Sequence, residues 1–356
     1  VKAVVQAGAR CAGSLAELSG DALAQKRELV ETLRTITEGK IFVEIERARL
    51  TKVLSDQLEK EGKVAAAAEL LQEVQVETYG SMEKREKTEF ILEQMRLTLD
   101  SQEYIRVKLL SSKIHQKILD SPAFQDCKVR FYELMIRFHL HDRDFLEVCR
   151  AYVNIFHTAS VQADPAQWQR YLRLVIVFTV LSPHSPEQHD LLHRVSAYEQ
   201  TAQLPTYRDL LKYFTTRELI CWPKLEALYQ PPLKDLPGLF DTEAAEEIWT
   251  VFHDRVVEHN IRAVSEYYKR IRLGRLSTLL DLTEEKTEEY ISTMVDRKLI
   301  YARINRPDRV VGFVRPQKPA ERLNDWSDKV TSLLDLLEKN SHLIHRENVL
   351  AAAAAK

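Results

Sequence analysis

Histidines at two places in the chain have spacings that could hold a metal ion. His139 and His141 form an HxH, which opens the metal motif of certain zinc-dependent deubiquitinases. That motif also requires a serine and an aspartate at fixed distances after the histidines, and here Cys149 and Tyr152 occupy those positions. The match fails, and we expect no zinc centre there.

The second group lies in the segment HSPEQHDLLH. His189 and His193 are four residues apart, as in the helix of a zinc protease, and His184 precedes them. The general-base glutamate of an HExxH motif is missing, because Asp190 follows His189. We interpret all three as surface histidines and assign no metal-binding residue.

Other catalytic signatures are also missing from the sequence. It contains no glycine-rich phosphate loop, no GxSxG and no Walker lysine. Cys11, Cys127, Cys149 and Cys221 form no CxxC pair, so reduced thiols are expected. We therefore predict a protein that is not an enzyme, with no catalytic residue and no cofactor. A catalytic pair of carboxylates remains the alternative.

The composition is typical of a folded helical protein with little net charge. Of the 356 residues, 45% are hydrophobic and 29% are charged, and the formal net charge is -2. No overall field would steer such a chain to nucleic acid or to an anionic membrane. The most apolar run, Leu172 to Leu181, contains Arg173 and is too short to span a bilayer. The expected partners include no membrane.

Most of the chain reads as amphipathic helices separated by polar turns, from Leu29 to about Tyr229. Gly62, Ser101 and Arg143 lie at comparable places in three turns, 39 and then 42 residues apart. Paired helices with a period of about forty residues are typical of an α-solenoid. We predict an all-α fold with an α-solenoid arm of helical-hairpin (TPR-like) repeats over residues 1–230.

A cluster of prolines between Cys221 and Phe240 predicts the end of the arm, because proline cannot continue a helix. After it we expect a long helix, a short helix, a helix capped by Thr283, and a small β-hairpin formed by LIYARI and VVGFV. These elements indicate a winged-helix module over residues 240–317.

The winged helix raises the question of nucleic-acid binding. The helix that would enter a DNA groove begins with Glu284, Glu285, Glu288 and Glu289, which would face a dense line of phosphates. Basic residues lie elsewhere, before the turn and on the wing. They are Lys269, Arg270, Arg272, Arg275, Arg303, Arg306 and Arg309. We favour a protein-binding module and predict no nucleic-acid partner, although the basic wing leaves that contact open.

A last helix is expected over residues 318–350, and its apolar positions repeat with spacings of three and four. They are Leu323, Trp326, Val330, Leu333, Leu337 and Ile344, with Asn340 as one polar position in the seam. Such a heptad seam is typical of a helix that packs against other helices. We favour partner helices outside the chain over a helix folded back on its own domain.

Several stretches resemble the PCI-domain subunits of the 26S proteasome regulatory-particle lid, and the resemblance extends from about Leu29 to Ile344. They are EGKIFVEIERARLTK (Glu38 to Lys52), VETYGSMEKREKTEFILEQMRL (Val76 to Leu97), LLKYFTTRELICW (Leu210 to Trp222), RVVEHNIRAVSEYYKRI (Arg255 to Ile271) and LNDWSDKV (Leu323 to Val330). The resemblance implies a PCI domain over about 140–317, and a chain whose arm is truncated at its N-terminus.

The resemblance implies that the chain is a non-catalytic scaffold subunit of a hetero-oligomer. That assembly would serve ATP-dependent degradation of ubiquitinated proteins, and the protein would reside in the cytoplasm and nucleus. Implied partners are other lid PCI subunits, the lid deubiquitinase and its partner subunit, and the ATPase ring and core particle, reached through the arm. The wing would pair with a neighbouring winged helix through Ile300, Ala302, Ile304, Val310, Val311 and Phe313. The seam of the last helix would enter a multi-subunit bundle.

Two other functions remain open beside this one. The paralogous PCI subunit of the COP9 signalosome has the same architecture, and an RNA-binding winged-helix subunit of a translation factor would use the same module differently.

Overall fold

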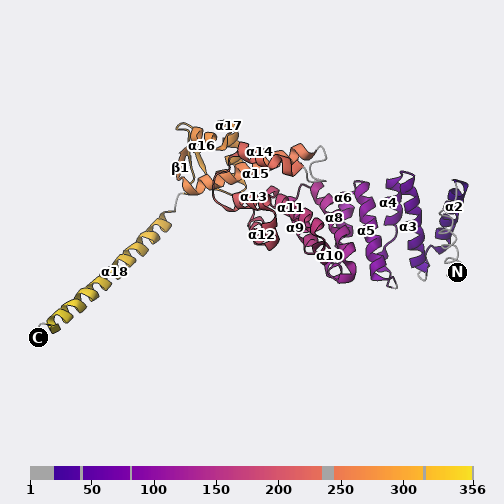
Figure 1. Cartoon of the computed structure of the whole chain (residues 1–356), viewed down its shortest axis with the longest axis horizontal. Helices are drawn as coiled ribbons and strands as arrows, with labels where there is room; N and C mark the ends of the chain where they lie inside the picture. The colour runs from indigo at the N-terminus through magenta and orange to yellow at the C-terminus, as the bar shows by residue number, and fades with distance from the viewer. Residues whose placement is uncertain (1–19, 41–42, 81, 235–243, 316–317, 355–356) are drawn as a thin grey trace. The chain divides into compact units, whose positions relative to one another are not determined.

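The computed structural model describes residues 20–40, 43–80, 82–234, 244–315 and 318–354 (Figure 1). The chain divides into two compact units. The arm unit comprises Val1–Arg217 and Lys224–Arg255, and the winged unit comprises Glu218–Pro223 and Val256–Lys356. Within the described residues, no helix has the length and apolar character to cross a membrane.

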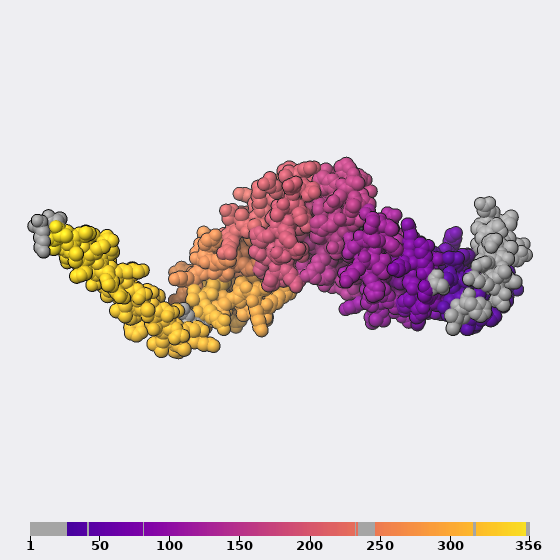
Figure 2. Space-filling model, turned by 90° about the horizontal axis from the view of Figure 1, so that it is seen from below, coloured from indigo at the N-terminus to yellow at the C-terminus, as the bar shows by residue number. Residues whose placement is uncertain are grey.

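The arm unit is helical, and its consecutive helices lie side by side (Figure 1). Figure 2 shows the surface of this unit, on which the colours follow the order of the chain. The first helices are α2 (Gly20–Thr37), α3 (Glu44–Lys60), α4 (Val64–Gln72), α5 (Lys84–Asp100), α6 (Tyr104–Ser112), α7 (Gln116–Leu119) and α8 (Gln125–His141). They are followed by α9 (Phe145–Phe156), α10 (Ala159–Ala163), α11 (Pro165–Leu181), α12 (Pro186–Ser196) and α13 (Pro205–Thr215). The helices α14 (Trp222–Lys234) and α15 (Ala244–Tyr267) each contribute residues to both units. Short 3-10 turns lie at Val76–Thr78, Pro122–Phe124 and Glu199–Gln203.

Three helical hairpins, α3–α4, α5–α6 and α8–α9, share one turn geometry. Gly62, Gln102 and Arg143 each adopt a left-handed backbone conformation, with φ of 79°, 61° and 58°. In each turn the next backbone N–H donates to a carbonyl five residues earlier, at 2.9–3.0 Å. These positions are 40 and 41 residues apart, which confirms the expected period. The middle position was wrong by one residue, because Gln102 and not Ser101 reverses the chain.

Helix α11 forms the centre of the core of the arm unit. Nine of its residues from Leu172 to Leu181 are buried, because α9, α12 and α13 all pack against it. A helix enclosed on several sides has apolar residues around most of its circumference. Phe178 is fully buried and stacks on Phe145 and Tyr152.

The proline cluster does not end a helix where the sequence indicated. Helix α14 continues through Pro231 and Pro232 and ends at Lys234. Buried side chains on either side hold this last turn: Leu233 is buried, and the buried Tyr229 donates its hydroxyl to the Thr206 carbonyl at 2.9 Å. Packing therefore overrides the local preference. The expected boundary between residues 230 and 240 lies partly outside the described residues, and it stays a prediction.

The winged unit contains β1 (Arg270–Arg272), α16 (Leu273–Leu280), α17 (Glu284–Asp296), β2 (Arg303–Asn305), β3 (Val310–Gly312) and α18 (Pro319–Ala354). Its core combines α15, α16 and α17 with the sheet, and includes Ile261, Leu276, Ile291 and Val311. The expected cap of α17 is confirmed, since the Thr283 hydroxyl accepts from the Lys286 backbone N–H at 3.4 Å.

The sheet has three antiparallel strands in the order β1-β3-β2. Ile271 and Ile304 both pair with Val311, so the strand after the wing lies at the centre of the sheet. Strand β1 was not expected, because three residues directly after a long helix give too short a pattern. The expectation that Val310, Val311 and Phe313 belong to the pairing edge was wrong, since both sides of β3 are paired.

Candidate protein-interaction surfaces

The histidines of the HxH face different neighbours. The His141 ring stacks on Tyr104, with ring centroids 3.6 Å apart, and its Nδ1 lies 3.3 Å from Asp142 Oδ1. His139 is half-buried beside Phe138, and burial lowers its pKa. Both side chains therefore take part in packing the turn after α8.

His189 and His193 lie on the exposed side of α12, as expected for surface histidines. Their Nε2 atoms are 3.3 Å apart, and His184 lies farther away, with its ring centroid 6.2 Å from that of His189.

The buried cysteines are packed as small apolar residues. Cys149 is fully buried, and its Sγ lies 3.0 Å from Thr179 Oγ1. Burial raises the pKa of this thiol to about 11, which keeps it protonated and a poor nucleophile near neutral pH. Cys127 is also buried, Cys221 is exposed, and all three are free thiols. Cys11 lies outside the described residues.

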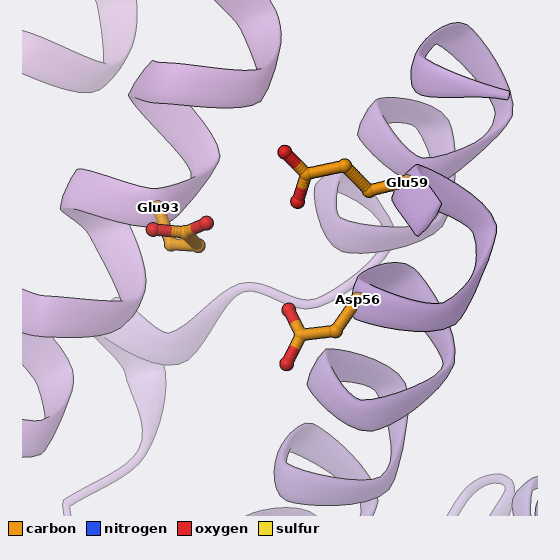
Figure 3. A group of neighbouring side chains, drawn as sticks. All are labelled: Asp56, Glu59 and Glu93. Carbon is orange, nitrogen blue, oxygen red and sulfur yellow. The ribbon is translucent and has the colours of Figure 1, made fainter. Parts of the chain in front are cut away.

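One carboxylate cluster could not be found from sequence spacing. Asp56 and Glu59 on α3 lie opposite Glu93 on α5, with ligand atoms within 4.8 Å of one another (Figure 3). The Arg96 guanidinium binds two of the three carboxylates: it lies 2.6 Å from Glu59 and 2.5 Å from Glu93. Its hydrogen bonds lower the pKa of Glu59, whereas burial raises the pKa of Asp56. Arg96 thus supplies the cation, and the cluster joins two helices.

Two arginines of the wing form ion pairs with two glutamates of the acidic helix within the winged unit. Arg306 Nε donates to Glu288 Oε1 at 2.8 Å, and Arg309 Nη1 lies 3.7 Å from Glu284 Oε2. These arginines are therefore directed at carboxylates of α17. A nucleic-acid phosphate would have to replace those carboxylates before it could use the same cations.

β2 is one of the two edge strands of the sheet, with β1 at the opposite edge, and it carries the residues assigned to partner binding. Leu273 N–H donates to the Arg309 carbonyl and Phe313 N–H to the Lys269 carbonyl, so Val311 bonds toward β1. By the alternation of antiparallel bonding, Val310 and Gly312 then bond toward β2. The backbone N–H and carbonyl of Ile304 consequently point away from β3.

The residues assigned to the winged-helix edge therefore separate into two sets. Val310 and Val311 belong to the central strand, and Val311 and Phe313 are buried in the core, so these three cannot form an edge. Ile300, Ala302 and Ile304 are half-buried on or beside β2. A partner-binding role stays a prediction for this second set.

Helix α18 exposes the complete seam that the sequence indicated. Leu323 and Trp326 are 63% and 66% exposed, and Val330, Leu333, Leu337 and Ile344 are exposed as well. A second apolar row was missed: Leu336, Leu343 and Leu350 are seven residues apart and also exposed. At 100° per residue the two rows together cover about half of the helix circumference. An apolar stripe this broad is wider than a contact with one helix requires.

Three family profiles match successive parts of the chain. They are PSMD12/CSN4, N-terminal, over residues 1–164, the PCI domain over 232–315, and the 26S proteasome regulatory subunit RPN5 C-terminal domain over 321–352. The 26S proteasome regulatory subunit RPN5 of Saccharomyces cerevisiae is 43% identical over 328 residues, which cover 92% of this chain and 74% of that protein. The chain belongs to the RPN5/PSMD12 family of 26S proteasome regulatory subunits.

Other relatives separate this family from its paralogue. The 26S proteasome non-ATPase regulatory subunit 12 of Dictyostelium discoideum is 42% identical, over 98% of this chain and 76% of that protein. The COP9 signalosome complex subunit 4 of Caenorhabditis elegans is 22% identical, over 88% of this chain and 76% of that protein. The resemblance to proteasome lid subunits is confirmed at the level of the RPN5/PSMD12 family, and the signalosome proteins are more distant.

Proposed function

We propose that the chain is a non-catalytic scaffold subunit of the 26S proteasome lid. The observation that carries this proposal is α18, a helix of 36 residues whose broad apolar stripe is exposed along its length. Each aliphatic side chain buried there would contribute roughly 1.5–3 kcal/mol to association, before the entropy lost on binding is counted. A family of proteasome regulatory subunits supplies the assembly in which that stripe would be covered.

We further propose which contacts each part makes. The stripe of α18 would enter a bundle with helices of the lid deubiquitinase, of its partner subunit and of other lid subunits. Both apolar rows of α18 would be covered only if helices pack on more than one side, and a bundle provides this arrangement. The arm would reach the ATPase ring and the core particle, and the assembled protein would reside in the cytoplasm and nucleus.

The edge of β2 would join a neighbouring winged helix. Strand addition needs backbone groups that point outward, and Ile304 provides one donor and one acceptor. Ile300 and Ala302 lie beside it and would contribute apolar contact. Of the six residues expected at this edge, the proposal keeps Ile300, Ala302 and Ile304.

A scaffold role accounts for the described residues better than catalysis or nucleic-acid binding. Glu59 and Glu93 of the α3–α5 cluster are bound by Arg96, the buried thiol of Cys149 has a raised pKa, and two wing arginines face α17. Each of these groups is engaged in holding the fold. A signalosome role has only the more distant relatives in its support.

The test is affinity capture of the tagged full-length protein from cell extract, followed by quantitative mass spectrometry. Proteasome lid subunits should be the most abundant co-purifying proteins. A sample dominated by signalosome subunits, or by ribosomal proteins sensitive to ribonuclease, would overturn the proposal.

A further inference from the structure

The outer face of the three-stranded sheet carries a basic patch. Ile271, Val311 and Ile304 pair across the strands and direct their side chains to the core. Their neighbours on each strand must point to the opposite face. That face has two cross-strand rows, Arg270–Gly312–Arg303 and Arg272–Val310–Asn305, and its three arginines are exposed.

The patch has an open floor between two cations. Gly312 lies between Arg270 and Arg303, and a Cβ built on it would meet nothing closer than 3.9 Å. The hollow above this glycine is also lined by Lys269, Tyr301 and Val314. Neighbouring strands are about 4.8 Å apart, so the two arginines stand roughly 10 Å apart across the floor.

The basic residues of the winged unit differ in whether a carboxylate binds them. Arg306 and Arg309 form ion pairs with α17, whereas Lys269, Arg270, Arg272 and Arg303 have no carboxylate partner among the described residues. Asp308 borders the hollow, but its carboxylate accepts from Asn305 Nδ2 at 2.7 Å. Among the described residues, the three arginines of the outer face and the adjacent Lys269 thus have no carboxylate partner, and Asp308 is the single acidic residue that lines the hollow.

We propose that this basic patch binds an acidic, extended segment of a partner protein. Its backbone would lie over Gly312, and its carboxylates would pair with Arg270 and Arg303 on either side. Arginine and tyrosine are the side chains that most often dominate protein interfaces, and Tyr301 stands beside the cations. The inference rests on the proposed scaffold role, and it adds the chemistry of one partner.

The experiment measures fluorescence anisotropy of a labelled ten-residue peptide of alternating glutamate and valine, titrated with the full-length protein. The same peptide with glutamine in place of glutamate is the neutral probe. The wild type should bind the acidic peptide in a saturable, salt-sensitive manner and bind the neutral one more weakly. Arg270→Glu with Arg303→Glu should weaken binding by roughly tenfold, since two favourable ion pairs become repulsive.

Two controls separate this site from general charge and from misfolding. Arg275→Glu with Lys286→Glu makes the same change in net charge at exposed positions outside the hollow, and should leave binding within about twofold, as expected for screened distant charges. Gly312→Leu should block binding with no change in charge. Gly312→Ala should retain it, because its methyl group fits in the open space.

Three results would overturn the proposal. They are no saturable binding of the acidic peptide by the wild type, equal binding by the Arg270→Glu, Arg303→Glu variant, and equal loss in the Arg275→Glu, Lys286→Glu control. Tighter binding of single-stranded oligouridine than of the peptide, lost in the Arg270→Glu, Arg303→Glu variant, would instead assign the patch to nucleic acid. Incorporation into the lid is measured separately, so failure here is distinguishable from failure of the scaffold role.

Discussion

Helices α11 and α18 are both rich in large apolar residues, yet they differ in what covers them. In α11 the residues from Leu172 to Leu181 are buried by α9, α12 and α13. In α18 the leucines, Trp326 and Ile344 are exposed along a helix of 36 residues. The apolar side chains of α11 are thus buried by other helices of the chain, whereas those of α18 are not.

This difference separates folding from assembly. Burial of apolar surface is the dominant favourable term in both processes. A side chain that is buried on folding has no apolar surface left to bury on association. Residues of α11 stabilise the chain itself. Residues of α18 leave that stability unchanged and remain available for association. Equivalent substitutions in the two helices should therefore have different consequences.

The largest expected effect is loss of assembly when the α18 seam is charged. Leu333→Asp with Leu337→Asp should exclude the chain from the lid, since two carboxylates would be buried without partners in the bundle. The thermal unfolding midpoint of the isolated chain should change little. Native gel and quantitative mass spectrometry of captured complexes measure the incorporation. Thr331→Asp with His342→Asp adds aspartates on the opposite side of α18 and should assemble. Normal incorporation of the seam variant would remove the basis for the bundle.

The second prediction concerns stability in the two helices. Phe178→Ala should lower the free energy of unfolding by about 3–5 kcal/mol, because it leaves a cavity in the core of the arm unit. Trp326→Ala, at a side chain that is 66% exposed, should change it by less than about 0.5 kcal/mol. Urea denaturation of the isolated chain compares them. Similar losses in both variants would mean that α18 is buried within its own chain.

The third prediction distinguishes the central strand from the open edge. Val311→Pro removes a ladder hydrogen bond and a buried side chain, and should destabilise the winged unit by about 1–3 kcal/mol. Ile304→Pro removes an N–H that points away from β3, so it should cost less stability and instead weaken incorporation into the lid. Circular dichroism, urea denaturation and capture experiments measure the two effects. The opposite ranking in stability would place the edge at β3.

Sequence patterns predicted the helices and the repeat well, because apolar spacing and turn chemistry are local. The same patterns could not place β1 or the centre of the sheet, since strand order depends on long-range pairing of three-residue segments. Pro231 and Pro232 wrongly indicated a helix end for a related reason. The burial of Tyr229 and Leu233 keeps this turn helical, and sequence spacing does not show that packing. The α18 seam could be predicted from residue spacing alone. The basic patch could not, because Arg270 and Arg303 are distant in sequence and become neighbours only through their pairing with β3.

The smallest expected effect is a dependence of stability on acid pH. Burial lowers the pKa of His139 below its ordinary value of about 6.5, so the unfolded chain binds more protons than the folded one at mildly acid pH. Stability should therefore fall as the pH drops below about 6.5. His139→Gln should reduce, without abolishing, the difference in unfolding midpoint between pH 7.5 and pH 5.5, because burial also lowers the pKa of His157. An unchanged difference in the variant would contradict this assignment.

The most direct test of the central claim is hydrogen–deuterium exchange of α18 in the free chain and in the assembled lid. The account predicts fast exchange along Pro319–Ala354 in the free chain and strong protection around Leu333 and Leu337 after assembly, with α11 protected in both states. Equal protection of α18 in the free chain and in the lid would contradict it.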